Sequence, residues 1–345
     1  MAETAIKTLA KTEILDRNFF IKTDEETIIL PLIRGPTRFE IDELRKLVPN
    51  ASSATEEFEP RTRHPRTLEE ALADRISPSL LSRLPRSFDV VGDIAVVQLD
   101  SDFAAYETSI ADAIMEVHPN VRAVFAKRGE ISGTERIMPL RYIAGENRTH
   151  TIHKEHGCLF KVDLAKVFFS PRLSAEHQRI AQRVDEGERV VDMFAGVGPF
   201  PILIAKRVGD VSVEAIDANP QAIELVRENV RVNKVESKIK VHLGDARDVI
   251  RRELTQSANR VIMNHPSASK DFIKDACNAL QPSGGVIHYY TFAGENWEAD
   301  SLREIEHGVD ASGYATERVL GIHRVREVAP MRWQVAVDLK VVPGR

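Results

Sequence analysis

The sequence predicts an α/β protein whose C-terminal part is a Rossmann-like, mostly parallel, doubly wound sheet, preceded by two smaller α/β segments. The first observation is a regular alternation of short apolar runs with amphipathic stretches from Arg179 onward. The second is the segment 190–200, which has the pattern of a buried strand, a tight glycine turn and a helix start. The third is Asp217, which closes the next apolar run 19 residues after Gly198. Together they predict a ligand site at the carboxyl edge of the sheet.

Glycines and acids stand at successive ends of the predicted strands. Gly196 and Gly198 would let a ligand approach the backbone closely, and Asp217 could accept hydrogen bonds from ribose hydroxyls. A further apolar run ends at Asp245, and another ends in Asn264-His265-Pro266. These strand ends favour S-adenosyl-L-methionine as the cofactor. A nicotinamide dinucleotide is disfavoured, because the turn reads Asp-x-Phe-x-Gly-x-Gly rather than the dinucleotide glycine spacing.

The composition is that of an ordinary globular protein of two or three domains. The chain has 345 residues, of which 43% are hydrophobic and 29% charged. It has no apolar run near the ~18 residues of a membrane span and no signal-peptide pattern, so we expect a cytoplasmic protein without membrane association. Cys158 and Cys277 stand alone, which argues against a disulfide framework or a bound metal.

Hydrophobic spacing divides the first half of the chain into two segments. In the first, helical spacing covers 6–15 and 41–48, and an apolar run at 27–32 predicts a strand. The acidic, proline-containing stretch 50–66 is typical of a linker. In the second segment we expect helices at 68–84 and 106–117, two strands over 88–99, and strands at 121–126 and 157–163.

From residue 179 onward the two periodicities alternate. Helical spacing occurs at 199–207, 220–233, 267–280 and 297–312. Strand-like runs occur at 190–192, 213–217, 240–243, 260–263, 285–290, 316–325 and 333–342. Because βα alternation builds parallel sheets with helices on both faces, we expect that arrangement here. The last two runs have no helix between them and are expected to pair antiparallel.

Basic residues gather in two places. The net charge of −5 argues mildly against extensive non-specific contact with nucleic acid. Local clusters nevertheless occur over 122–154 and 323–326, and we take five of these residues as candidates for RNA contact: Arg148, His150, Lys154, Arg324 and Arg326. A solvated surface without a partner is the alternative interpretation.

Several segments resemble the archaeal/eukaryotic-type tRNA (guanine-37 N1)-methyltransferase family. The similarity is carried by Phe-Ser-Pro-Arg-Leu at 169–173, by Phe-Ala-Gly-Val-Gly at 194–198, and by the stretches 144–155, 263–266 and 285–290. It extends from about Phe88 to the C-terminus and is only loose before that.

The resemblance implies three domains and a reaction. The domains are an N-terminal one over 1–60 that contacts the tRNA elbow, a middle RNA-positioning one over 61–155, and a class I S-adenosylmethionine methyltransferase domain over 156–345. Family members move a methyl group from the cofactor to N1 of guanosine 37, next to the anticodon. The expected partner is therefore a tRNA that carries guanosine 37, and the expected oligomeric state is a monomer.

The resemblance also assigns three catalytic residues. Guanine N1 carries a proton, so its methylation needs a base. Glu176 matches the base position, and we expect burial in a dry pocket to raise the pKa of its carboxyl group. Arg136 matches an arginine that faces O6, and Asn264 an amide that reads the guanine edge. From spacing alone, Glu176 is instead a helix N-terminal carboxylate, Arg136 a surface arginine and Asn264-x-Pro266 a turn.

A cofactor pocket follows from the same motifs. Its predicted residues are Phe168, Arg172, Asp192, Phe194, Ala195, Gly196, Gly198, Asp217, Asp245, Asn264 and Pro266. For Phe168, core packing is nearly as good an interpretation. Two residues depart from the family pattern: His265 stands where leucine is usual, and His177 where arginine is commoner.

Two other functions remain open at this point. A relative on the wyosine pathway would use the same turn to transfer the aminocarboxypropyl group or to methylate a tricyclic guanine derivative, although Glu176 and Asn264-His265-Pro266 favour methyl transfer to N1. A non-catalytic tRNA-binding protein with a vestigial cofactor pocket is the second, and the intact glycine turn argues against it.

Overall fold

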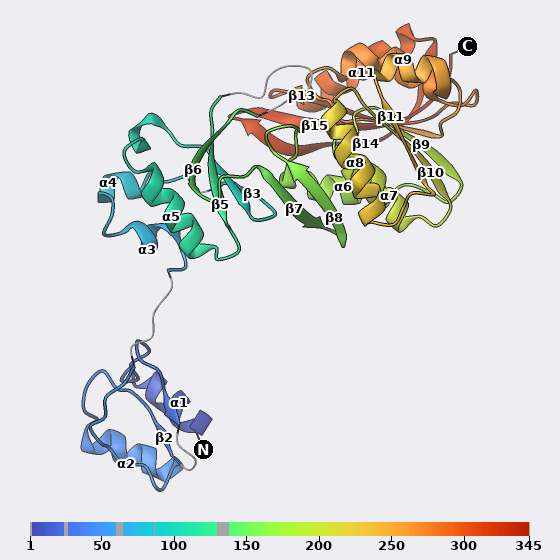
Figure 1. The fold of residues 1–345 in the computed structure, drawn as a ribbon. Coiled ribbons are helices and arrows are strands. Elements are labelled where there is room, and N and C mark those ends of the chain that lie inside the picture. Colours follow the sequence, from blue (N-terminus) through green and yellow to red (C-terminus); the bar gives the residue numbers. More distant parts are fainter. Residues whose placement is uncertain (1, 24–26, 60–64, 86, 130–137, 345) are drawn as a thin grey trace. The chain divides into compact units, whose positions relative to one another are not determined.

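The computed structural model describes residues 2–23, 27–59, 65–85, 87–129 and 138–344. The chain divides into two compact units, Met1–Thr67 and Leu68–Arg345 (Figure 1). Among the described residues, no helix has the length and apolar character that crossing a membrane requires.

The first unit contains two helices and a very short strand pair. The helices are α1 (Ala2–Lys11) and α2 (Arg38–Leu47), and the antiparallel strands are β1 (Lys22–Thr23) and β2 (Ile28–Ile29). α2 begins at a capping box between Thr37 and Glu40. The helix predicted over 6–15 ends early, because Leu15 instead bridges to Leu32. That bridge lies within the run predicted as one strand over 27–32, of which only β2 forms.

The second unit begins with a four-stranded sheet. Its order is β3 (Asp89–Val91), β4 (Ile94–Val97), β5 (Ala123–Lys127) and β6 (Leu140–Gly145). α3 (Leu68–Leu72), α4 (Pro78–Leu81) and α5 (Glu107–Val117) share one hydrophobic core with it, and η1 (Ser101–Phe103) precedes α5. The single helix predicted over 68–84 is therefore wrong, because Pro78 starts a new helix. β7 (His150–Glu155) and β8 (Cys158–Asp163) form a separate antiparallel hairpin.

A seven-stranded sheet forms the C-terminal part, in the order β11-β10-β9-β12-β13-β15-β14. Its strands are β9 (Glu188–Asp192), β10 (Val211–Asp217), β11 (Ile239–Leu243), β12 (Arg260–Met263), β13 (Gly285–Ala293), β14 (Tyr314–Ala329) and β15 (Arg332–Pro343). The first five run parallel. β15 is antiparallel to both β13 and β14, which confirms the expected pairing of the last two strands.

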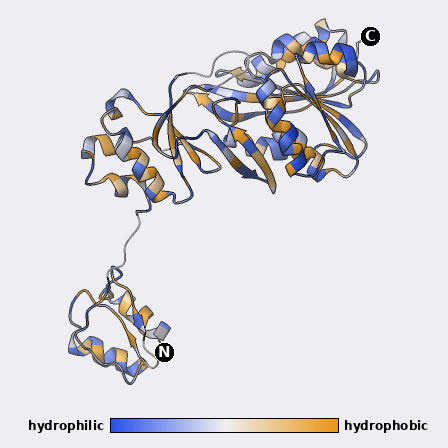
Figure 2. Ribbon diagram, viewed as in Figure 1, coloured by the Kyte–Doolittle hydropathy of each residue, from blue (hydrophilic) through white to orange (hydrophobic). Residues whose placement is uncertain are grey.

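Helices cover both faces of this sheet, so the doubly wound prediction is confirmed. α6 (Ser174–Ala181), α7 (Pro199–Arg207) and α8 (Pro220–Val232) pack on one face, while α9 (Ala246–Val249), η3 (Ile250–Leu254), α10 (Ile273–Ala279) and α11 (Trp297–Ala311) pack on the other. Val190 enters the first core and its neighbour Val191 the second, as strand alternation requires. Figure 2 shows the hydrophobic residues along these strands. The short helices η2 (Pro171–Leu173) and η4 (Ser269–Phe272) precede α6 and α10.

Candidate active site

The glycine turn connects β9 to α7 in a left-handed backbone conformation. The φ angles of Gly196 and Gly198 are +55° and +89°. Of the atoms in the described residues, a Cβ placed on Gly196 would find only the carbonyl oxygen of Phe168 within 4 Å, at 3.9 Å, so these residues leave the space beside this glycine open. Ala195 is buried and donates its backbone N–H to Ile216 at 2.8 Å, which ties the turn to β10. The half-buried backbone of Gly196 therefore borders open space at the carboxyl edge of the sheet.

Gly198 serves packing rather than access, and this gives a first prediction. Its Cβ would lie 2.6 Å from Val226 Cγ2 on α8. Gly198→Ala is expected to lower the free energy of unfolding by about 2–4 kcal/mol, from strain and clash together. Gly187→Ala is the matched control, because its φ is +80° but nothing lies within 4 Å of its Cβ; it should lose only about 1–2 kcal/mol. Equal losses in urea unfolding would refute the steric explanation.

Asp217 holds the turn in place from the end of β10. Its Oδ2 accepts the N–H of Gly196 at 2.7 Å, and its Oδ1 accepts the N–H of Asn219 at 2.9 Å. A carboxylate can accept about four hydrogen bonds on its two oxygens. The residue can therefore both brace the glycine turn and accept hydrogen bonds from ligand hydroxyl groups.

Asp192 lies at the start of the turn and is fully buried. Its Oδ1 accepts the N–H of Phe194 at 3.2 Å, and its Oδ2 has no hydrogen-bond partner among the described residues. Burial raises the pKa of this carboxyl group to about 7. The hydrogen bond from Phe194 lowers the pKa, but less than burial raises it, and the nearby charge of Asp217 raises it further. An unpartnered buried carboxyl oxygen beside an open glycine fits the cationic amino acid portion of the predicted cofactor.

The raised pKa of Asp192 predicts a pH dependence of stability. The folded protein keeps a proton that the unfolded chain releases near its ordinary pKa of ~4. Stability from this group should therefore decrease as the pH rises from about 4 to about 7, and then level off. Urea unfolding at a series of pH values should show this component in the wild type and not in Asp192→Asn. Parallel pH curves for the two proteins would contradict the assignment.

Asp245 is the first of a series of side chains in contact with one another. It caps α9 by accepting the N–H of Arg247 at 2.8 Å and pairs with the Arg247 guanidinium at 2.6 Å, which lowers the pKa of the carboxyl group. Arg247 lies 4.7 Å from the centroid of the Phe272 ring. Phe272 contacts Phe194 edge-on at 5.0 Å, and Phe194 contacts His265 at 5.1 Å. The structure thus brings Phe194, Asp245 and the unusual His265 into one group.

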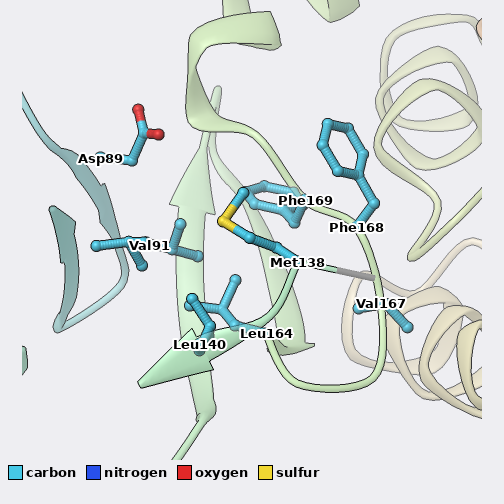
Figure 3. Close-up of a pocket in the computed structure, with 9 residues that line it drawn as sticks. Asp89, Val91, Met138, Leu140, Leu164, Val167, Phe168 and Phe169 are labelled. Carbon is cyan, nitrogen blue, oxygen red and sulfur yellow. The ribbon is translucent and has the colours of Figure 1, made fainter. Parts of the chain in front are cut away.

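Phe168 and Arg172 lie where the segment before α6 meets β3 of the four-stranded sheet. Phe168 lines a small cavity of about 20 Å³ together with Met138, Leu140 and Val91 (Figure 3). Arg172 binds Asp89 of β3, with an Nε–Oδ1 distance of 2.5 Å. The carbonyl of Phe168 also faces Gly196, so this loop passes beside the glycine turn.

Glu176 lies in the first turn of α6, with only 5% of its surface exposed. Arg179 donates to both of its oxygens, at 2.6 and 2.8 Å. The buried Tyr290 hydroxyl donates to Oε1, and His323 Nε2 lies 3.2 Å from Oε2. The carboxylate is therefore enclosed under the helix and held by side chains from β13 and β14.

The predicted direction of the Glu176 pKa is wrong. Burial does favour the neutral acid, but hydrogen bonds from Arg179, His323 and Tyr290 and the charge of Arg179 outweigh it, and the pKa falls to about 2. The prediction from burial left out Arg179, which follows Glu176 by three residues, a spacing at which side chains on a helix meet. Because Arg179 also binds Asp338, its charge is shared between two carboxylates.

Asn264 follows β12 and belongs to a second polar group on the same side of the sheet. Its Oδ1 accepts from Gln334 Nε2 at 3.2 Å, and Gln334 Oε1 accepts from Arg326 Nε at 3.0 Å. Arg326 Nη1 donates to Ser170 Oγ at 3.2 Å. Pro266, two residues after Asn264, is buried. Arg326, predicted as an RNA contact, therefore lies beside Asn264 in the candidate site.

The remaining RNA candidates differ in their surroundings. Arg148 donates hydrogen bonds to Asp93, to Glu146 and to the carbonyl oxygen of His150. His150 and Lys154 are exposed on β7. They line a groove of about 850 Å³. The exposed Arg324 lies between two indole rings, 5.4 Å from the Trp297 centroid and 5.1 Å from that of Trp333.

Arg136 lies outside the described residues. Within them, sequence reasoning missed the side chains that surround Glu176 and Asn264: Arg179, Tyr290, His323, Gln334 and Asp338. A usable signal was present, because His288, Gln334 and Asp338 are polar residues within otherwise apolar strands and all three are buried. His177, the other departure, is buried against Glu155 at 2.7 Å rather than facing the site.

Models of known protein families match most of the chain. The TRM5/TYW2 methyltransferase domain matches residues 151–315. The TYW2 N-terminal domain matches 68–149, and the tRNA methyltransferase 5 N-terminal domain matches 1–40.

Individual relatives match along nearly the full length. The tRNA (guanine(37)-N(1))-methyltransferase Trm5b of Pyrococcus abyssi is 37% identical over 343 residues, which cover 98% of this chain and 96% of the relative. The tRNA 4-demethylwyosine(37)-methyltransferase Taw21 of Saccharolobus solfataricus is 33% identical and covers 74% of this chain and 94% of its own. The solved complex of aTrm5 with tRNALeu has a TM-score of 0.80 and 32% identity, covering 98% of this chain and 96% of that one. Identity of this extent shows common descent, and the chain therefore belongs to the TRM5/TYW2 methyltransferase family.

Proposed function

We propose that this chain is a tRNA methyltransferase that transfers the methyl group of S-adenosyl-L-methionine to N1 of guanosine 37. The observation that carries the proposal is the enclosed Glu176 carboxylate on the sheet face that also holds Asn264, beside an open glycine turn. The similarity to the P. abyssi Trm5b over 98% of the chain supports the same activity.

The cofactor is assigned to the carboxyl edge of β9, β10 and β11. Gly196 and Gly198 shape the turn, Asp192 faces the cationic portion, and Asp217 and Asp245 take the ribose and adenine. When bound, S-adenosyl-L-methionine supplies an electrophilic methyl group. The remaining proposed members of the pocket are Phe168, Arg172, Phe194, Ala195, Asn264 and Pro266.

The protein's main chemical task is to manage the N1 proton. As the N1–H bond breaks, its electron pair stays on N1 for the new N–C bond, and Glu176 takes the proton. Arg136 and Asn264 are assigned to the guanine edge, where charge develops on O6. The low pKa of Glu176 makes it a weak base while Arg179 binds both oxygens, so we infer that Arg179 shifts toward Asp338 during transfer.

RNA binding is assigned to basic residues outside the cofactor turn. His150 and Lys154 are exposed along the groove on β7, and Arg324 is exposed on β14. Arg326 is assigned to the nucleotide that enters the site, and Arg148 supports the groove through Asp93.

We further propose a tRNA-elbow domain over 1–60, an RNA-positioning domain over 61–155 and a catalytic domain over 156–345. The full chain is proposed to act as a cytoplasmic monomer.

One assay tests this function. The full-length protein is incubated with methyl-labelled cofactor and unmodified tRNA transcripts carrying guanosine or adenosine at position 37. Label is expected on the guanosine transcript only, at N1 after nuclease digestion. Labelling of both transcripts, or of neither, would overturn the proposal.

The wyosine-pathway alternative has its own support, because the match over 68–149 is to a TYW2 N-terminal domain. It predicts a different product mass. Methylation adds about 14 Da to the nucleoside, whereas aminocarboxypropyl transfer adds a larger group. Mass spectrometry of the nucleoside at position 37 separates methyl transfer from aminocarboxypropyl transfer. The remaining wyosine-pathway reaction, methylation of a tricyclic guanine derivative, is tested with a tRNA that carries the tricyclic base.

A further inference from the structure

Gln334 is a buried amide in an apolar strand. Its exposed fraction is 1%, and Val335, Ala336 and Val337 follow it in the hydrophobic core. A buried amide without partners costs about 1–3 kcal/mol, so such a residue is satisfied when retained. Gln334 has a partner at each end: Arg326 at its oxygen and Asn264 at its nitrogen.

The backbone builds the first of these contacts. Arg326 on β14 is the register partner of Gln334 on β15, so the two side chains lie on the same face of the sheet. Ser170 accepts from Nη1 of Arg326 and fixes the guanidinium from the opposite side. Among the described residues, Arg326 forms no ion pair, which leaves Gln334 as the acceptor for its Nε–H.

This contact determines the orientation of both amides. An arginine can only donate, so the Gln334 oxygen must face Arg326 and its NH2 group must face Asn264. Asn264 must then present its oxygen to Gln334. The NH2 group of Asn264 has no partner among the described residues, and it remains for a ligand.

We propose that Gln334 is a positioning residue that makes Asn264 a hydrogen-bond donor toward O6 of the target guanine. This rests on the proposed function. O6 has two lone pairs, so Asn264 and Arg136 can both donate to it. Adenine carries an amino group at the same position, and two facing donors repel. The hydrogen-bond series from Arg326 through Gln334 to Asn264 would therefore favour guanosine over adenosine at position 37 without any contact between Gln334 and the RNA.

Two variants of Gln334 separate polarity from packing. In Gln334→Glu the carboxylate keeps Arg326 but cannot donate, so Asn264 must turn its NH2 group inward and its oxygen toward the base. Gln334→Met keeps the volume and leaves Asn264 free to adopt either orientation. Single-turnover rates on guanosine-37 tRNA should be highest for the wild type, lower for Gln334→Met and lowest for Gln334→Glu. We expect Gln334→Glu to be about 10²-fold slower than wild type. The dissociation constant of the cofactor should stay within about two-fold. Gln178→Glu, on the exposed side of α6, is the matched control and should keep the wild-type rate.

A transcript with inosine at position 37 tests the contact with O6. Inosine keeps O6 and the N1 proton but lacks the 2-amino group, so Gln334→Glu should slow both transcripts by the same factor. A wild-type rate for Gln334→Glu, a slower rate for Gln334→Met than for Gln334→Glu, or a loss confined to guanosine would overturn the inference. The activity of the wild-type protein on guanosine-37 tRNA tests the proposed function separately. If the wild type methylates this tRNA, any of the three contrary results for the variants refutes only the role of Gln334.

Discussion

Glu176→Gln is expected to slow single-turnover methyl transfer by about 10²–10⁴-fold, the usual contribution of a general base. The glutamine oxygen can replace Oε1 and still accept from Arg179 Nη2 and Tyr290, and the side chain occupies a similar volume beneath α6, although the bond from Arg179 Nε to Oε2 is lost. It cannot take the N1 proton. Because the hydrogen-bond partners of Glu176 among the described residues are Arg179, Tyr290 and His323 rather than the glycine turn, the cofactor dissociation constant should remain within about two-fold of wild type.

Three measurements isolate this effect. Rapid-quench assays at saturating tRNA give the transfer rate, a fluorescence titration gives cofactor affinity, and thermal unfolding reports stability. Glu224→Gln is the control, because Glu224 is exposed on α8 and does not line the groove on β7. Since the pKa of Glu176 is held at about 2, the wild-type rate should show no titration of this group between pH 5 and 8. Equal losses of transfer and cofactor binding would make Glu176 a structural residue.

Asp338→Asn is expected to destabilise the protein by about 3–5 kcal/mol, the range for breaking a buried ion pair from one side. Asp338 is fully buried and binds Arg179, Arg183 and His288. Burial opposes its ionisation, but His288 and Arg179 outweigh this and hold the pKa of the carboxyl group below its ordinary value. The substitution leaves the partly buried guanidinium groups of Arg179 and Arg183 without their shared carboxylate.

Urea unfolding at neutral pH measures this loss, with Asp300→Asn on the exposed surface of α11 as the control. The lowered pKa also sets a direction with pH. The stabilisation from Asp338 is complete above the ordinary carboxyl pKa of ~4 and is lost as the pH falls toward the folded-state value. The difference between wild type and Asp338→Asn should therefore shrink in acid. A loss under 1 kcal/mol at neutral pH would contradict the role of Asp338 as the shared partner of these cations.

Much of the architecture was predictable because its signals are local. The helix beginning at Pro199 and the strand over 260–263 have the bounds that hydrophobic spacing indicated. The glycine turn was predictable for the same reason, since positive φ angles and a strand-terminal acid are encoded within about 30 neighbouring residues. β6 and β7 were missed, because their alternating exposed and buried residues include several charges and few long apolar runs.

The electrostatics of the site were not predictable in this way. Besides burial, the pKa of Glu176 depends first on Arg179, which is only three residues away, but also on His323 and Tyr290, which are 147 and 114 residues away in sequence. The orientation of Asn264 depends on Gln334, which is 70 residues away. Spacing along the chain indicates which groups reach the edge of a sheet, but the sign of a pKa shift requires their neighbours from other strands.

The long β14–β15 pair also has a consequence for how the enzyme is made. Every residue of the glycine turn and its acids precedes residue 246, whereas His323, Arg326, Gln334 and Asp338 lie on these two final strands. During synthesis on the ribosome, a nascent chain would expose the cofactor-binding turn before His323, which contacts Glu176, and Gln334, which contacts Asn264, have been translated. Loss of the last 30 or so residues by premature termination would thus leave a protein with its nucleoside-binding motifs but without an organised proton-transfer apparatus.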